Sequence, residues 1–125
     1  MEIHTSYFAR VKDLQEMGYD NLWCVAGYAP KFFHDMPNAH FIPELAPRKV
    51  WWQYWHDNNM PNEFYVEQYN DTVLSKLDPN EVVRTMGDNA VMLCYEKPVD
   101  FCHRHLIADW ISKNTGVKVD EISFD

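Results

Sequence analysis

The stretch from Ala90 to Ile111 limits the fold of this 125-residue chain more than any other. It reads AVMLCYEKPVDFCHRHLIADWI: a continuous apolar run, a short polar turn, and then apolar residues at helical spacing. Short apolar runs bounded by turn residues are typical of strands that are buried on both faces, as in a parallel sheet. We therefore expect a buried strand over Ala90–Tyr95 that leads into an amphipathic helix.

The helix after the turn has suitable start and stop signals. Asp100 is a favourable N-cap residue, and Gly116 is favourable at the C-terminal exit. Its apolar stripe consists of Leu106, Ile107, Trp110 and Ile111. The helix is therefore expected to begin within the polar turn, directly after the strand.

The rest of the chain alternates between strand and helix patterns. Strands are expected over residues 2–8, 21–29 and 117–124. Helices are expected over residues 10–17, 49–56, 61–77 and 78–86. The last of these begins with the capping-box signature Asp78-Pro79-Asn80-Glu81. Residues 28–48 contain four prolines, which leave little room for regular structure, so we expect a long loop there.

Strands that alternate with helices predict an α/β fold: a single layered domain with a mostly parallel, Rossmann-like sheet flanked by helices. The chain is long enough for one such domain and too short for two, so residues 1–125 are assigned to one domain. In open parallel sheets, ligands bind at the carboxyl ends of the strands. That edge would bring together Ser6, Tyr7, Arg10, the Gly27–Tyr28 region and the segment from Cys94 to Arg104.

The start of the helix carries the strongest candidates for chemistry. N–H groups in a first helical turn attract anions and lower the pKa of a thiol held beside them. Cys102 is therefore a candidate nucleophile, His103 an acid or base, and Arg104 a clamp for a carboxylate or phosphate. Each has a plainer alternative. Cys102 would be a small core residue, His103 a hydrogen-bonded core residue, and Arg104 the partner of an acid such as Glu96.

Cys94 and Glu96 stand on the other side of the polar turn. They are two residues apart, so their side chains should point the same way, and a carboxylate there can act as general acid or base. The alternatives are packing for Cys94 and anchoring of the turn for Glu96; Cys24 is expected to be structural. The candidate catalytic residues are Cys102, His103, Glu96 and Cys94. The candidate ligand-binding residues are Arg104, Ser6, Tyr7 and Arg10.

Common cysteine and nucleotide motifs are absent. Seven residues separate Cys94 from Cys102, so they form no Cys-x-x-Cys redox or zinc pair. No arginine lies six positions after either cysteine, so the Cys-x5-Arg phosphate-binding loop is absent. The four glycines form no nucleotide-binding loop. A metal ion held by Cys94, Cys102 and His103 is a further alternative, but this spacing matches no common site. We assign neither a metal nor a cofactor.

An aromatic segment, KVWWQYWH, covers Lys49 to His56. Helical spacing would align its Trp and Tyr side chains in a stripe, and packing of this stripe on the core is the preferred interpretation. The alternative is a stacking wall for a ligand or a surface for a partner.

The acidic composition narrows the choice of partners. A formal net charge of −8 argues against binding of a nucleic-acid polymer, whereas a pocket for one small anion is compatible with it. The first ten residues lack a signal-peptide pattern, and no apolar run approaches the length of a membrane span. Three cysteines without a scaffold spacing favour a reducing compartment. We expect a cytoplasmic protein that does not contact the membrane.

The segment LCYEKPVDFCHRHLIADWI, with TSYFAR near the start and ELAP in the proline-rich loop, resembles the family called domain of unknown function 488. The family hallmark is an apolar strand ending in Leu-Cys-x-Glu, a short gap, and Cys-His-Arg opening a helix. It is matched residue by residue at Cys94, Glu96, Cys102, His103 and Arg104, and Ser6 and Tyr7 match the end of the first strand. The resemblance implies a small prokaryotic or phage α/β domain without specifying a reaction. Residues 50–69 depart from the family pattern.

Together these features lead to a hypothesis about function. The protein would be a small enzyme that binds an anionic, nucleotide-like ligand in a Cys/His/Arg/Glu pocket at the carboxyl edge of the sheet. The alternative is a non-catalytic module that holds a small ligand in the same pocket, or that binds a protein partner through residues 51–55.

Overall fold

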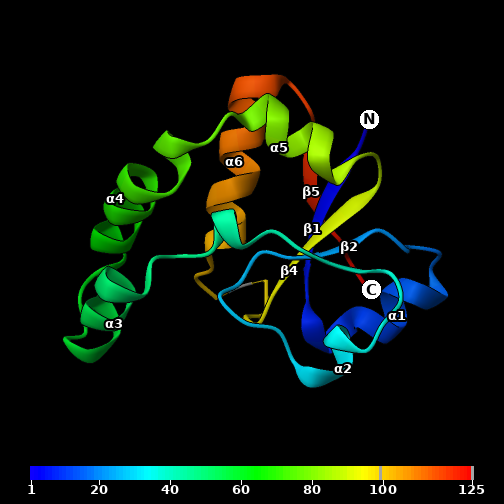
Figure 1. Cartoon of the computed structure of the whole chain (residues 1–125), viewed down its shortest axis with the longest axis horizontal. Coiled ribbons are helices and arrows are strands. Elements are labelled where there is room, and N and C mark those ends of the chain that lie inside the picture. Colours follow the sequence, from blue (N-terminus) through cyan, green and yellow to red (C-terminus); the bar gives the residue numbers. More distant parts are fainter. Residues whose placement is uncertain (99, 125) are drawn as a thin grey trace.

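The computed structural model describes residues 1–98 and 100–124. Within them, five parallel strands form one sheet in the order β3-β2-β4-β1-β5 (Figure 1). The strands are β1 (Ile3–Tyr7), β2 (Leu22–Cys24), β3 (Ala39–Phe41), β4 (Ala90–Cys94) and β5 (Val119–Glu121). The predicted α/β fold with a parallel sheet is confirmed.

Helices cover both faces of this sheet. They are α1 (Val11–Glu16), α2 (Lys31–His34), α3 (Lys49–Asp57), α4 (Asn62–Thr72), α5 (Pro79–Met86) and α6 (His103–Thr115). Short 3-10 turns lie at Phe8–Arg10, Pro43–Leu45 and Leu74–Lys76. Helices α1 and α2 contribute to the core on one face, and α3 to α6 contribute to the core on the other. No helix in the described ranges is both long and apolar enough to cross a membrane.

Strand β4 is the centre of the sheet, as its apolar sequence predicts. Ala90, Met92 and Cys94 face the core beneath α3 to α6, whereas Val91 and Leu93 face the core beneath α1 and α2. None of the five is more than 1% exposed. Because alternate strand residues point to opposite faces, a strand between two helical layers favours apolar residues on both faces. The uninterrupted apolar sequence of β4 is therefore explained by burial on both faces of the sheet.

Two expectations about boundaries are wrong. Asp100 is not the N-cap of α6: its backbone N–H donates to the Lys97 carbonyl, so it belongs to the turn after β4. The helix starts at His103, and Cys102 is the N-cap. The proline-rich loop also holds regular structure, namely α2 and β3. A three-residue edge strand such as β3 is formed by pairing with β2 and leaves little local signal in the sequence.

Other boundaries differ by less. Strand β2 and strand β5 are shorter than expected, and the helix predicted over 61–77 is interrupted after Thr72, with a 3-10 turn following it. Helix α5 matches its prediction: Asp78 is its N-cap, and Gly87, with a φ of +81°, ends it. Glycine reaches this conformation with little steric cost, which explains the sharp stop.

The cap of α5 gives a first testable prediction. The Asp78 carboxylate accepts a hydrogen bond from the Asn80 backbone N–H at 2.9 Å. Asp78→Ala should lower the free energy of unfolding by about 1 kcal/mol, whereas Asp78→Ser, which retains a capping oxygen, should cost less. Urea denaturation of the two variants measures the difference. Equal stability of Asp78→Ala and the wild type would show that the cap contributes nothing.

Candidate active site

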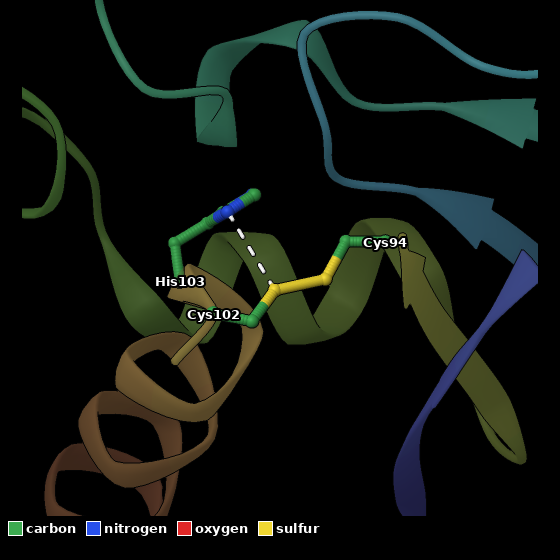
Figure 2. A group of neighbouring side chains, drawn as sticks. All are labelled: Cys94, Cys102 and His103. Carbon is green, nitrogen blue, oxygen red and sulfur yellow. Dashed lines mark hydrogen bonds between the residues drawn. A yellow bond between two sulfur atoms is a disulfide. The ribbon is translucent and has the colours of Figure 1, made fainter. Parts of the chain in front are cut away.

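The polar turn between β4 and α6 brings two cysteines together at the carboxyl edge of the sheet. Cys94 ends β4, Cys102 immediately precedes α6, and a disulfide joins their sulfur atoms (Figure 2). A disulfide between cysteines with seven residues between them follows from no local sequence motif, and this pairing was not predicted. Cys24, the third cysteine, is free and buried, and burial raises the pKa of its thiol. The candidate site therefore holds a disulfide-bonded cysteine pair.

His103 adds a nitrogen atom to this pair. Its Nδ1 lies 4.0 Å from the Cys102 sulfur (Figure 2). Its Nε2 lies 2.7 Å from the Val25 carbonyl oxygen, which can only accept, so Nε2 carries the proton and Nδ1 is left as a base. Burial lowers the pKa of His103 to about 4, with a smaller contribution from the charge of Arg104. The imidazole is therefore neutral near pH 7, and its lone pair faces the cysteine sulfur.

Arg104 has partners that differ from the expected ligand. Its side chain is fully buried, and its Nε and Nη2 atoms each donate to a different carboxylate oxygen of Glu121 at 3.1 Å. Its Nη1 donates to the Cys94 sulfur at 2.9 Å and to the Glu96 carbonyl at 2.7 Å. All three nitrogens are thus occupied by groups of the protein. Arg104 therefore holds the end of β4, the turn and β5 together. This matches the alternative in which Arg104 pairs with an acid of the protein, and that acid is Glu121.

A cavity of about 840 Å³ opens beside the cysteines. The sequence candidates that line it are Cys94, Glu96, Cys102, His103, Gly27 and Tyr28. The other lining residues were not named individually as candidates, although Tyr95 and Phe101 lie in the segment expected at this edge: Ala26, Ala46, Pro47, Lys49, Trp52, Gln53, Trp55, His56, Tyr65, Tyr95 and Phe101. Ala46 and Pro47 belong to the ELAP segment. The cavity therefore combines the turn after β4 with α3, α4 and the segment after β2.

Aromatic rings form much of the cavity wall. The ring of Tyr65 packs edge-on against Trp55 at 5.0 Å and against Phe101 at 4.8 Å between centroids. Trp52 stacks on His56 with ring planes 10° apart. The preferred interpretation of the aromatic segment of α3 holds for Trp51, which is buried in the core, whereas Trp52 and Trp55 line the cavity as well as packing on the core.

The cavity lining carries charge of both signs, from Lys49 and Glu96. Helices α3 and α6 both begin at the cavity, at Lys49 and His103, and the N-terminus of a helix carries partial positive charge. Lys49 adds a full positive charge. Glu96 is the acidic side chain of the lining and lies near Tyr65, whose pKa is raised mainly by burial and also by this charge. The lining therefore combines a lysine and two helix N-termini with one carboxylate.

The residues at the end of β1 lie elsewhere. Tyr7 and Arg10 line a second cavity of about 290 Å³, together with Glu121 and Phe124. Arg10 pairs with Asp13 and lies over the Phe124 ring, 4.4 Å from its centroid. Ser6 is fully buried, and its hydroxyl has no partner among the described residues. The eight candidate residues therefore do not share one site. The large cavity is lined by Cys94, Glu96, Cys102 and His103, and the second cavity by Tyr7 and Arg10. Arg104 lies between the two cavities.

These features define an α/β protein with a cysteine–histidine pocket at the carboxyl edge of a parallel sheet. Residues 6–115 match the family model described as the active DUF488-N3 subclade, and the chain belongs to this subclade of the DUF488 family. The match includes every candidate site residue and ends before Glu121. No curated protein and no solved structure matches the chain.

Proposed function

We propose that this protein is an enzyme that binds a small, planar, anionic ligand of the nucleotide type and attacks it with the Cys102 thiolate. The observation that carries this proposal is the Cys102–His103 pair, with sulfur and Nδ1 4.0 Å apart, at the wall of an aromatic cavity. The description of the matching subclade as active supports an enzymatic role.

The ligand class follows from the shape and lining of the cavity. Its volume of about 840 Å³ is within the range of sites that bury a nucleotide-sized molecule. Trp52 and Trp55 offer aromatic faces against which a planar heterocycle can stack. Lys49 and the starts of α3 and α6 favour a phosphate or carboxylate on the same ligand. A nucleotide carries both groups.

The chemistry begins once a dithiol or phosphine reductant has opened the Cys94–Cys102 disulfide. His103 Nδ1 then takes the proton of the Cys102 thiol, and the thiolate forms a bond to an electrophilic carbon of the ligand. The proton then passes from the imidazolium, directly or by way of the Glu96 carboxylate, to the atom of the ligand that gains the electron pair. In the reduced protein Arg104 stabilises negative charge on Cys94 through its Nη1–S contact. Arg104 thus positions the site and does not contact the ligand.

Selective alkylation tests the nucleophile. In the reduced, metal-free protein at pH 7, iodoacetamide should modify Cys102 at least about 10-fold faster than an unperturbed thiol, because His103 Nδ1 accepts the thiol proton as the sulfur attacks. His103→Gln should remove that advantage, since its amide can still donate to the Val25 carbonyl but provides no base. Peptide mass spectrometry identifies the modified cysteine. Cys24→Ser is the matched control, because Cys24 faces the other core and should not alter the rate.

Ligand binding is tested with the same reduced protein. Nucleobases, nucleosides and mononucleotides are titrated while tryptophan fluorescence is recorded, because a base stacked on Trp52 or Trp55 quenches their emission. Mononucleotides should bind more tightly than nucleosides, and Lys49→Met should reduce that preference. Binding with an unreactive Cys102 would favour the non-catalytic module. An unreactive Cys102 without binding of any compound would overturn both the ligand class and the chemistry.

A further inference from the structure

Three soft donor atoms meet at the cavity wall. One ligand atom each from Cys94, Cys102 and His103 lies within 4.8 Å of the other two, and all three residues are buried (Figure 2). Two thiolates and one imidazole are the donor set that zinc prefers, with metal–sulfur bonds of about 2.3 Å and metal–nitrogen bonds of about 2.0 Å. The sequence analysis gave this set as an alternative whose spacing matches no common site, and it is the fold that brings Cys94 to Cys102.

The surroundings of these donors resemble those of metal ligands. His103 donates its Nε2 proton to the Val25 carbonyl, which directs Nδ1 toward the sulfurs; a second hydrogen bond of this kind orients most metal-binding histidines. Arg104 donates to the Cys94 sulfur, which favours its thiolate form. Cys102 precedes α6, whose N-terminal partial charge favours a second thiolate.

The two sulfurs have room to separate. In a tetrahedral zinc site two thiolates lie roughly 3.8 Å apart, given bonds of about 2.3 Å. The Cα atoms of Cys94 and Cys102 are 7.5 Å apart, and both side chains border the large cavity. The fourth coordination position of an ion bound here would therefore face the cavity, which is the arrangement of a zinc site that can bind water or a small molecule.

We propose that the reduced protein binds one zinc ion through Cys94, Cys102 and His103, with the fourth position open to the cavity. Binding requires prior two-electron reduction of the disulfide by a phosphine or dithiol, and it releases the two thiol protons. The Cys102 thiolate, which the proposed function uses as a nucleophile, would then coordinate the ion, so zinc binding competes with thiol chemistry. The inference does not depend on the proposed function, because metal binding is measured directly and thiol reactivity is measured in metal-free protein.

The experiment titrates the full chain, reduced with a phosphine and freed of metal, with Co²⁺ as a spectroscopic substitute for zinc. We expect one ion per chain, a thiolate-to-cobalt charge-transfer band and the intense visible bands of tetrahedral coordination. Zinc should displace the cobalt and should protect Cys102 from iodoacetamide. Cys94→Ser and Cys102→Ser should each weaken zinc binding by more than the roughly 100-fold that loss of an outer hydrogen-bond partner can cost.

Two further variants identify the remaining ligand and control for Cys24. His103→Gln should weaken binding while retaining the charge-transfer band, because both thiolates remain. Cys24→Ser should bind like the wild type. If a cysteine variant fails to fold, the oxidised wild type replaces it, since a disulfide leaves no thiolate to bind. The proposal is overturned if reduced wild-type protein shows no charge-transfer band, or if oxidised protein binds cobalt equally well.

Discussion

Arg104→Met is expected to lower the free energy of unfolding by about 3–5 kcal/mol, the usual cost of removing one partner of a buried ion pair. The Arg104 side chain is 0% exposed, and the Glu121 side chain with which it pairs is 23% exposed. Methionine fills similar space, but it leaves the Glu121 carboxylate without its charged partner, with the Thr5 hydroxyl as its remaining donor among the described residues, and the Glu96 carbonyl without its donor. Urea denaturation, with every sample held in one redox state, measures the loss.

Arg84→Met is the matched control for this substitution. Arg84 also pairs with a glutamate, Glu81, but both side chains are about two-thirds exposed, at 67% and 64%. Exposed pairs of this kind contribute little, so the stability of Arg84→Met should stay within about 0.5 kcal/mol of the wild type. If Arg104→Met were as stable as Arg84→Met, the buried pair would not hold the end of β4 to β5.

The second large effect is expected at Tyr65, where substitution by alanine should cost about 3–5 kcal/mol, the range for deleting a buried aromatic side chain. Tyr65 is 3% exposed, and its ring contacts Trp51, Trp55 and Phe101, with centroids 4.8–5.0 Å apart. Phe101 belongs to the turn before α6, so Tyr65 attaches α3 and α4 to the candidate site. Urea denaturation and the fluorescence of the packed tryptophans should both report the change.

Tyr54→Ala serves as the control for Tyr65. Tyr54 lies on α3 and is 52% exposed, with Phe64 as its aromatic neighbour. Its loss should change stability by about 0.5 kcal/mol or less. Hydrogen exchange adds a local measurement: the amides of α3 should exchange faster in Tyr65→Ala than in Tyr54→Ala. Equal protection of α3 in the two variants would contradict the attachment role of Tyr65.

Much of the fold was predictable because its signals are local. The run over β4, the cap at Asp78 and the stop at Gly116 depend on neighbouring residues alone, and each lies where the sequence predicts it. The start of α6 was not predictable in this way. Asp100 is a good capping residue, but the turn after β4 uses it first, and Cys102 takes the cap position without a side-chain hydrogen bond among the described residues.

For the candidate site, too, the residues at strand and helix ends were predictable from sequence, whereas the contacts between distant segments were not. Cys94, Glu96, Cys102 and His103 could be named because strand and helix ends are recognisable in sequence. The disulfide, the Val25 carbonyl behind His103 and Glu121 behind Arg104 could not, since each joins segments that no spacing rule connects. The aromatic wall was noticed as a stripe, but the sequence could not tell which of its rings would face a cavity.

The position of Arg104 also has a topological consequence. The chain leaves β1 toward the face covered by α1 and leaves β4 toward the face covered by α6, although these two strands are neighbours and Tyr7 pairs with Cys94 at their ends. In open α/β sheets, ligands commonly bind in the crevice between two neighbouring strands whose following connections lie on opposite faces of the sheet. Here the guanidinium of Arg104 and its carboxylate partner fill that crevice. The space available to a ligand is consequently shifted toward β2, where α3 and α4, and not the switch in strand order, determine its shape.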